Sequence, residues 1–164
     1  MALNFEQKQA IVAEVAEVAR VAYSAVAAEY RGISVEKMTA LRVAARKSGV
    51  YLRVVKNTLA RRAIKDTEFE CMADGLTGPL VLAFSQEDPG AAARVIKDFA
   101  KENDALKVTL VSIGGRMLAP SELETLAKMP TYEQAVSMLM SVMKAPVQKD
   151  RKSTRLNSSH RIRY

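Results

Sequence analysis

The sequence contains few of the residues that build disulfides, metal sites and nucleophilic catalytic sites. It has no tryptophan, one cysteine (Cys71) and one histidine among its 164 residues. A lone cysteine cannot form an internal disulfide, and one cysteine with one histidine is too small a set for structural zinc or a catalytic pair. We therefore expect no metal or cofactor, and we predict that Cys71 is a small core residue, because unpaired cysteine is commonly buried.

Long apolar runs and common enzyme motifs are absent as well. No segment approaches the roughly 20 apolar residues that span a bilayer, and the first residues, MALNFEQKQA, lack the basic and apolar parts of a signal peptide. The sequence has no GxxxxGK, GxGxxG, HExxH or GxSxG motif. These absences predict a cytoplasmic protein that is not an enzyme, has no catalytic residues and does not bind a membrane.

Local patterns predict several helices in a chain of globular composition, with 49% hydrophobic and 26% charged residues. Capping residues followed by apolar residues at helical spacing predict helices after Asn4, Ser34 and Asp88. A shorter helix is predicted where Asn57 or Thr58 would act as the cap.

Short apolar runs between the helices predict strands. Gly114 and Gly115 can supply the positive φ of a tight turn between the last two strands. Two capping-box spacings, at residues 121–124 and 131–134, predict two helices near the end of the chain. The strands are expected at residues 23–28, 50–55, 80–84, 106–111 and 116–119.

This order of strands and helices predicts an α+β fold. We expect a two-layer, plait-like domain over residues 1–129, in which a mixed sheet carries helices on one face. A C-terminal helical extension is expected to begin at residue 130 and to include residues 130–149.

Positive charge is concentrated in residues 31–65, which we name the basic block. The basic block contains ten lysines and arginines and one acidic residue, Glu36. Residues 1–30 contain two basic and four acidic residues, and residues 66–149 contain eight basic and twelve acidic residues. An uncompensated cluster of cations repels itself until an anionic partner neutralises it. An ordinary solvated surface is the alternative, although such a surface is expected to include more aspartate and glutamate.

Helical spacing predicts that the cations of the basic block share a surface. Arg42 and Arg46 fall on one face of the second helix, and Arg61 and Arg62 fall on one face of the third. Arg53 on the intervening strand could join the two faces into one continuous patch. Arginine suits this role because its guanidinium group can bind phosphate through two hydrogen bonds.

The partner of such a patch could be RNA, DNA or an anionic membrane. A membrane is least favoured, because the apolar stripes of these helices are narrow and are needed for the core. Tyr51 is the only aromatic residue in the basic block, and Tyr30 directly precedes the block. Two aromatic rings are too few for a base-stacking platform, so a folded nucleic acid recognised by shape and backbone is expected.

Several motifs resemble the bacterial ribosomal stalk-base protein family, the L10 family of the large subunit. The resemblance covers residues 1–149, and its most specific part is the string Val-Val-Lys-Asn-Thr-Leu at residues 54–59, which follows an Arg-Gly turn. The other matching residues are Tyr30-Arg31-Gly32-Ile33-Ser34-Val35, Met38, Leu41-Arg42, Gly49, Ala63, Gly78-Pro79, Asp88-Pro89-Gly90-Ala91-Ala92-Ala93, Leu126-Ala127 and Pro130-Thr131-Tyr132.

The resemblance implies a structural protein that binds large-subunit ribosomal RNA beside the neighbouring ribosomal protein L11. A C-terminal helix would anchor dimers of the acidic stalk protein, which recruit translation GTPases. By position, the resemblance implies RNA contacts by Arg31, Gly32, Lys56, Asn57 and Thr58. The charge pattern adds Arg42, Arg46, Arg53, Arg61 and Arg62. A related ribosome assembly factor or an RNA-binding translational regulator is the alternative.

The last predicted helix has an apolar stripe. Val136, Leu139, Met140 and Met143 lie at helical spacing and are predicted to bind the stalk-protein dimers. Packing of this stripe against the protein's own domain is the alternative.

The final residues have a different character. Residues 150–164, DRKSTRLNSSHRIRY, show no helical stripe and resemble a translated sequencing adapter. We expect a non-native, disordered tail, with a native basic tail as the alternative. The resemblance implies a dimer-binding helix that continues beyond Lys149, so dimer binding by this chain is expected to be impaired.

Overall fold

The computed structural model describes residues 4–65, 67–103 and 105–159, with side chains described up to residue 146. The chain divides into two units, Met1–Met129 and Pro130–Tyr164, and each unit is described by itself. The elements of the first unit are α1 (Phe5–Val21), β1 (Ser24–Glu29), α2 (Val35–Lys47), β2 (Val50–Val54), α3 (Asn57–Ile64), η1 (Glu70–Met72), β3 (Leu80–Ser85), α4 (Ala91–Glu102), β4 (Lys107–Ile113), β5 (Arg116–Leu118), η2 (Pro120–Glu122) and α5 (Leu123–Ala127).

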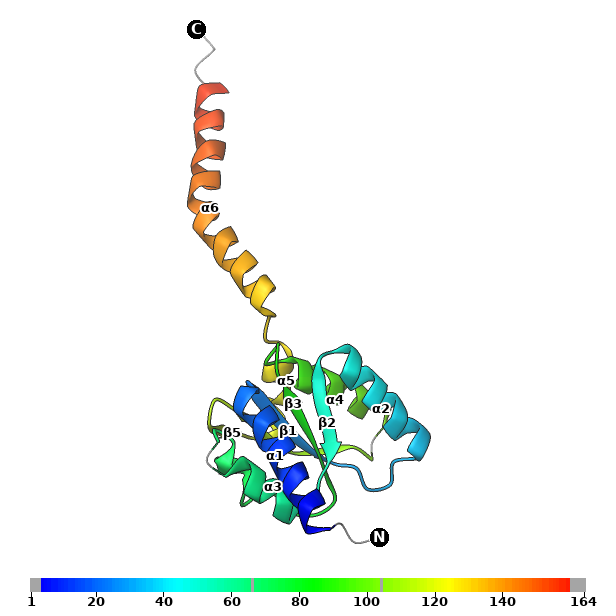
Figure 1. Ribbon diagram of the computed structural model, residues 1–164. Helices are drawn as coiled ribbons and strands as arrows, with labels where there is room; N and C mark the ends of the chain where they lie inside the picture. The colour runs from blue at the N-terminus through cyan, green and yellow to red at the C-terminus, as the bar shows by residue number, and fades with distance from the viewer. Residues whose placement is uncertain (1–3, 66, 104, 160–164) are drawn as a thin grey trace. The chain divides into compact units, whose positions relative to one another are not determined.

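The strands form one sheet in the order β2-β3-β1-β4-β5 (Figure 1). All four pairings are antiparallel. The predicted α+β class is therefore confirmed, and the expected mixed character of the sheet is wrong. Strand direction depends on which strands pair across long stretches of chain, and apolar periodicity carries no information about that choice.

Helices cover both faces of the sheet, so the expected two-layer arrangement is also wrong. Along β1, Ala25 and Ala27 pack with α1 and α3 in one core, whereas Val26 and Ala28 pack with α4 and α5 in a second core. Strand β3 alternates in the same way, and each of its residues is buried. Two buried faces explain why residues 25–28 and 80–84 of these strands are all apolar and do not alternate with polar residues.

Several local predictions are confirmed at the ends of elements. Asn4 and Gln7 form the capping box of α1, and the Ser34 side chain accepts a hydrogen bond from the Lys37 amide at the start of α2. Gly114 and Gly115 have φ values of 51° and 77° in the β4–β5 turn, as a tight hairpin requires.

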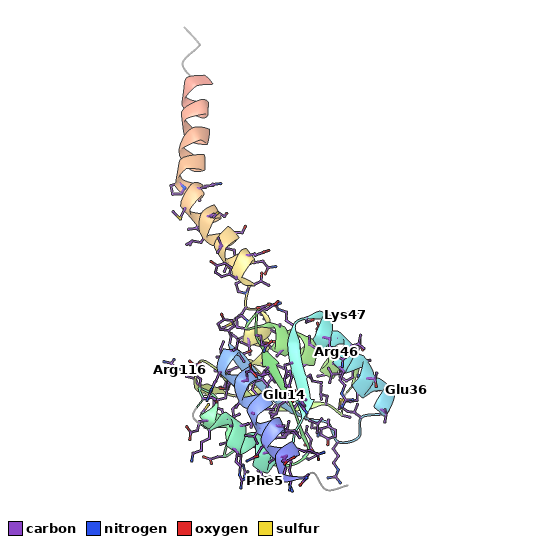
Figure 2. All side chains as sticks on the ribbon, viewed as in Figure 1. Phe5, Glu14, Glu36, Arg46, Lys47 and Arg116 are labelled. Carbon is purple, nitrogen blue, oxygen red and sulfur yellow. The ribbon has the colours of Figure 1, made fainter. Side chains whose placement is uncertain are left out.

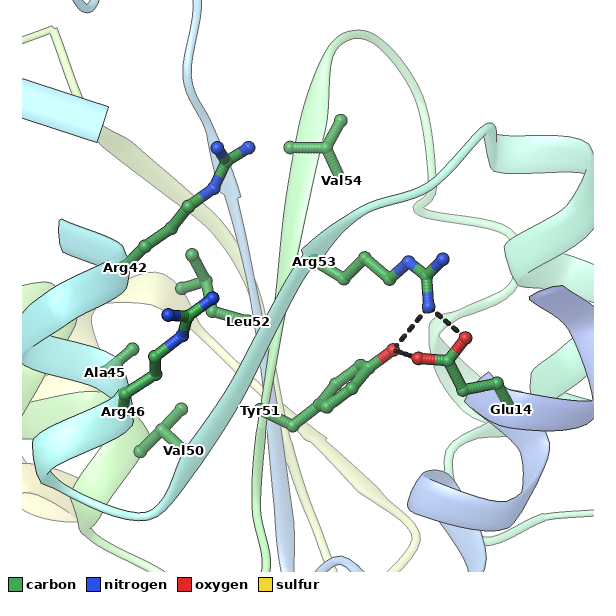
Figure 3. Close-up of a pocket in the computed structure, with 9 residues that line it drawn as sticks. All are labelled: Glu14, Arg42, Ala45, Arg46, Val50, Tyr51, Leu52, Arg53 and Val54. Carbon is green, nitrogen blue, oxygen red and sulfur yellow. Dashed lines mark hydrogen bonds and ion pairs between the residues drawn. The ribbon is translucent and has the colours of Figure 1, made fainter. Parts of the chain in front are cut away.

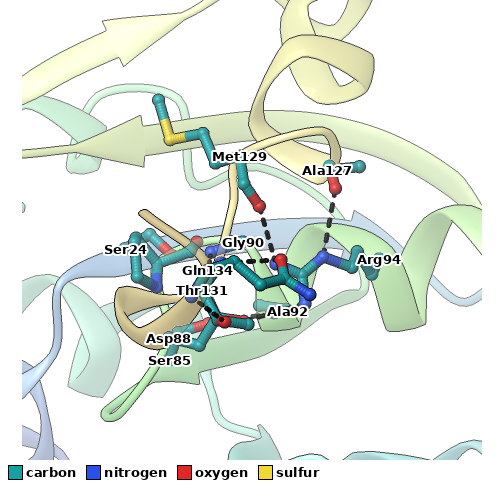
Figure 4. Close-up of polar contacts among 11 residues, drawn as sticks. Ser24, Ser85, Asp88, Gly90, Ala92, Arg94, Ala127, Met129, Thr131 and Gln134 are labelled. Atoms are coloured by element: carbon teal, nitrogen blue, oxygen red, sulfur yellow. Dashed lines mark hydrogen bonds and ion pairs between the residues drawn. The ribbon is translucent and has the colours of Figure 1, made fainter. Parts of the chain in front are cut away.

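Polar side chains fix α4 to the sheet and to α5 (Figure 4). The Ser24 hydroxyl donates to the Pro89 carbonyl at 2.7 Å, and the Ser85 hydroxyl accepts from the Ala92 amide at 2.9 Å. Arg94 donates to the carbonyls of Ala127 and Met129 at 3.1 and 2.8 Å. The two serine bonds satisfy buried hydroxyl groups, which are costly when left without partners.

The second unit contains α6 (Tyr132–Ser159), which has Pro146 in its interior. The predicted capping box is confirmed, because the Thr131 amide donates to Gln134 Oε1 at 3.2 Å and the Thr131 hydroxyl accepts from the Gln134 amide at 3.4 Å. The expected disorder of residues 150–164 is wrong as far as Ser159, because α6 continues to that residue. Residues 147–159 contain no glycine or proline to interrupt a helix. Residues 160–164 lie outside the described residues.

Candidate nucleic-acid interface

Three loops lie at one end of the sheet: the loop after β1, the loop after β2 and the loop before β3. Strands β1 and β2 both run antiparallel to β3. Glu29 at the end of β1 is therefore opposite Leu80 at the start of β3, and Val54 at the end of β2 is opposite Val81. The chain segments that leave β1 and β2 consequently meet the segment that enters β3.

These segments surround a shallow depression of about 360 Å³, which we name the loop-end hollow. Its lining residues are Tyr30, Val54, Val55, Lys56, Asn57, Thr58, Gly78, Pro79 and Leu80. The Tyr30 amide donates to the Pro79 carbonyl at 3.3 Å and ties two of the segments together. Arg31 and Gly32 follow Tyr30 in an exposed turn, and Gly32 has a φ of 88°, a conformation that favours glycine.

The start of α3 forms one side of the loop-end hollow and differs from its predicted capping. The N-cap residue is Lys56, with no side-chain hydrogen bond to the helix, so the expected cap by Asn57 or Thr58 is wrong. The Asn57 side chain instead donates to the Gly78 carbonyl at 2.9 Å, across 21 residues of sequence. This long-range contact holds the start of α3 against the loop that precedes β3. Thr58, the residue after Asn57, is exposed.

An uncapped helix start next to a lysine is suited to an anion. The first amide groups of a helix have no partner within the helix, and their dipoles favour negative charge. Lys56 is exposed at this point, and the side chain of Asn57 is engaged elsewhere. A phosphate group could thus meet a lysine and helix amides at the same place.

The cations of the basic block do not form the one continuous patch that the sequence predicted. Helix α3 packs into the core that includes α1, through residues such as Leu59 and Ile64, whereas α2 packs into the core on the opposite face through Ala45. Arg42 and Arg46 are therefore separated by the sheet from Arg61 and Arg62. The prediction failed because helical spacing places residues on a helix face but does not determine which side of the sheet the helix covers.

Arg42, Arg46 and Arg53 meet instead along the outer edge of β2 (Figure 3). They line a depression of about 510 Å³, which we name the edge groove. Arg42 and Arg46 reach it from α2 on one side of β2, and Arg53 lies on the other side with Tyr51 and Glu14. The other lining residues are Ala45, Val50, Leu52 and Val54.

Arg53 is held by an internal ion pair. Its guanidinium group pairs with the Glu14 carboxylate of α1 and donates to the Tyr51 hydroxyl at 3.0 Å, and that hydroxyl donates to Glu14 at 2.7 Å. The Tyr51 and Arg53 hydrogen bonds lower the pKa of Glu14, and burial raises the pKa of the Tyr51 hydroxyl. Glu14 is not predicted as a partner of Arg53 from the sequence, because no local motif links it to residues 37 or more positions away.

Arg61 is also engaged within the protein. Its Nε donates to the Ala73 carbonyl and its Nη2 to the Leu76 carbonyl, both at 2.9 Å. These bonds hold the loop after η1. Met72 at the end of η1 and Leu76 in this loop are buried in the same core as α3. Arg62, the next residue, is exposed.

Most cations of the basic block are not neutralised by carboxylates. Among the described residues, Arg53 is the one member of the basic block in an ion pair. Helix α4 of the acidic part of the chain is different, because Arg94, Lys97 and Lys101 each pair with a carboxylate at 2.8 to 3.1 Å. Figure 2 shows Arg46 and Lys47 near one end of α2 and Glu36, the acidic residue of the block, near the other.

The apolar stripe of α6 is mostly exposed. Leu139, Met140 and Met143 have 61%, 55% and 69% of their surface accessible, and Val136 is half-buried. A row of large apolar side chains on one helix is a common docking element for another helix.

Other kinds of site are not found in the described part of the chain. No cluster of three or more potential metal ligands occurs among the described residues, and none of the helices described there is long and apolar enough to cross a membrane. Cys71 is half-buried at the edge of a core, with its Sγ 3.4 Å from the Ser112 hydroxyl.

Comparison with known proteins identifies the family. The profile described as Ribosomal protein L10 matches residues 3–101, and that described as Ribosomal protein uL10 C-terminal region matches residues 129–149. Proteins with the name large ribosomal subunit protein uL10 from Thioalkalivibrio sulfidiphilus, Methylococcus capsulatus and Halorhodospira halophila are 67%, 66% and 58% identical over 149 residues. Each match covers 91% of this chain and 85% of the relative.

These names are those of a structural component of the ribosome, so the prediction that the chain is not an enzyme is confirmed. The first matched segment contains every lining residue of the loop-end hollow, and the second includes the first part of α6. The chain belongs to the uL10 family of large ribosomal subunit proteins.

Proposed function

We propose that the first unit binds large-subunit ribosomal RNA at the loop-end hollow and that α6 anchors dimers of the acidic stalk protein. The observation that supports the RNA-binding proposal is that Arg31, Lys56 and Arg62 are exposed and have no carboxylate partner among the described residues, and that Lys56 is at an uncapped helix start. Neutralisation by phosphates would remove the mutual repulsion of these cations.

Each residue of the proposed RNA site has a distinct role. Lys56 and the first amides of α3 bind a phosphate, and Thr58 adds an exposed hydroxyl. Arg31 approaches the RNA from the turn after β1, where Gly32 leaves room for a close backbone contact. Arg62 extends the contact along α3.

The remaining predicted residues support this site less directly. Asn57 and Arg61 hold the loops that shape it, through their bonds to Gly78, Ala73 and Leu76. Arg42, Arg46 and Arg53 line the separate edge groove at β2.

Helix α6 is proposed to bind the stalk-protein dimers through Val136, Leu139, Met140 and Met143. The exposed stripe supports this assignment, because methionine side chains adapt to irregular partner surfaces. The family resemblance supports ribosomal protein L11 as a neighbour of the first unit on the ribosome. The stalk dimers would in turn recruit translation GTPases.

The RNA site is tested by binding of large-subunit ribosomal RNA, with transfer RNA as competitor. Lys56→Glu is expected to weaken binding by roughly a hundredfold, since it removes one contact and introduces repulsion. Lys101→Glu is the matched control, because Lys101 is exposed on α4 and already paired with Asp98. Equal affinities of both variants and the original protein would refute the site.

The dimer site is tested by co-purification with the acidic stalk protein. Leu139→Asp and Met140→Asp should abolish the residual binding of dimers, because a charge within the stripe opposes its burial. Ser141→Asp is the control, since Ser141 lies on the other side of the helix from the stripe. If all three variants retain dimers equally, α6 does not bind them through this stripe.

A further inference from the structure

The edge groove follows the outer edge of the sheet. Strand β2 is at the end of the strand order, and β3 is its neighbour. All five residues of β2 line the groove, which α2 borders on one side and Glu14 of α1 on the other (Figure 3). The groove is therefore a channel with a strand as its floor and helices at its sides.

The backbone of β2 is available for a further strand. In an edge strand, alternate residues direct their N–H and C=O groups away from the neighbouring strand. Within the described residues, the hydrogen bonds of the β2 backbone are those of its ladder with β3. Five residues of strand extend about 17 Å, so the groove has room for an extended segment of about the same length.

The charges of the groove specify what such a segment should carry. Arg42 and Arg46 are exposed on the side of the groove formed by α2 and have no ion pair with a described residue. Residues four apart on a helix are separated by about 6 Å along its axis. Residues two apart on a strand are separated by about 6.7 Å. Carboxylates at alternate positions of an added strand would therefore match the spacing of the two arginines.

The opposite side of the groove has a different chemistry. Arg53 is already neutralised by Glu14, and the Tyr51 hydroxyl bonds to both. Side chains of an added strand that face Arg53 and Tyr51 therefore need no charge. The groove thus distinguishes the two faces of an added strand, one acidic and one neutral.

We propose that the edge groove binds an extended acidic polypeptide segment, which adds a strand to β2 and places carboxylates at alternate positions opposite Arg42 and Arg46. This mode, β-strand addition, uses main-chain hydrogen bonds for affinity and alternate side chains for specificity. An RNA backbone fits the groove less well, because it lacks the alternating amide donors and carbonyl acceptors with which a strand would pair the outward N–H and C=O groups of β2. A second copy of the chain is disfavoured, since its own arginines would face those of the first.

The probe for this proposal is a fluorescent ten-residue peptide with glutamate at alternate positions and threonine and valine between them. Binding to the full chain is measured by fluorescence anisotropy. One control peptide has the same composition with the glutamates grouped at one end. A second has N-methylated amides at every residue, which removes the donors needed for a strand ladder in either register. The proposal expects each control to bind at least about tenfold more weakly, equivalent to 1.4 kcal/mol.

Variants of α2 locate the site. Arg42→Gln and Arg46→Gln are each expected to weaken binding of the alternating peptide about fivefold to tenfold. Lys47→Gln is the matched control, because Lys47 is exposed on the same helix but does not line the groove. Amide exchange of residues 50–54 should slow when the peptide is bound, because their outward N–H groups become hydrogen-bonded.

Three results would overturn the proposal. Equal binding of the alternating and grouped peptides would show that charge attraction alone, without strand addition, accounts for the binding. Absence of peptide binding would mean that the arginines only protect the sheet edge from aggregation. Weakened binding of ribosomal RNA by Arg42→Gln and Arg46→Gln, with peptide binding unchanged, would assign the groove to RNA. Circular dichroism of each variant shows whether it is folded.

Discussion

Arg61 and Arg62 are adjacent on α3 but have different surroundings, so replacement by alanine should affect them differently. Arg61→Ala removes two charge-assisted hydrogen bonds of 2.9 Å to the carbonyls of Ala73 and Leu76. Bonds to charged groups contribute about 1.5 to 3 kcal/mol each when shielded from water. Because Arg61 is exposed, water replaces part of the contribution of these bonds. We therefore expect Arg61→Ala to lower the free energy of unfolding by roughly 1 to 3 kcal/mol. Arg62→Ala should change the free energy of unfolding by less than about 0.5 kcal/mol.

Thermal unfolding followed by circular dichroism measures this difference. At roughly 2 to 4 °C per kcal/mol for a chain of this size, Arg61→Ala should lower the Tm by about 2 to 12 °C, and Arg62→Ala should leave it within about 2 °C. Binding of ribosomal RNA should show a separate effect of Arg62→Ala, because its side chain is proposed to bind phosphate. A Tm that falls for Arg62→Ala and not for Arg61→Ala would refute the structural role assigned to Arg61.

Three further predictions concern the core, the sheet edge and the turn after β1. Phe84→Ala should destabilise the protein by about 3 to 5 kcal/mol in urea unfolding, because Phe84 is 2% exposed and its ring lies 5.9 Å from that of Phe69; a loss below about 1 kcal/mol would contradict this packing. The lowered pKa of Glu14 predicts that its contribution to stability is present above pH 4.5, its ordinary value, and is lost as the pH falls through the folded value. Glu14→Gln should therefore flatten that part of the acid unfolding curve, and an unchanged curve would exclude the contribution. Gly32→Ala should cost about 1 to 2 kcal/mol, because Gly32 has a φ of 88°; a stabilised variant would show that the turn does not need this conformation.

Features that depend on residues close together in sequence could be predicted from the sequence. The capping box of Asn4, the cap of Ser34 and the hairpin turn at Gly114 and Gly115 are confirmed, because each requires only side chains or φ values within a few residues. The strands were placed within about two residues for the same reason, since apolar periodicity is local.

Features that depend on distant segments could not be predicted in this way. The expected cap by Asn57 failed because its side chain reaches the Gly78 carbonyl instead. The expected single surface of cations failed because α2 and α3 cover opposite faces of the sheet. The sequence did contain a signal that both faces of the sheet are covered. Residues 25–28 and 80–84 are continuous apolar runs, whereas strands of a sheet with one exposed face alternate apolar and polar residues.

Cations of the basic block are proposed to bind ribosomal RNA through its phosphates. The most direct test is the affinity of the protein for large-subunit ribosomal RNA, measured between about 50 and 200 mM salt. Four to six phosphate contacts predict a fall of roughly a hundredfold to a thousandfold over this range, with a shallower dependence for Lys56→Glu. An affinity that does not change with salt, or a slope that Lys56→Glu leaves unaltered, would contradict the account.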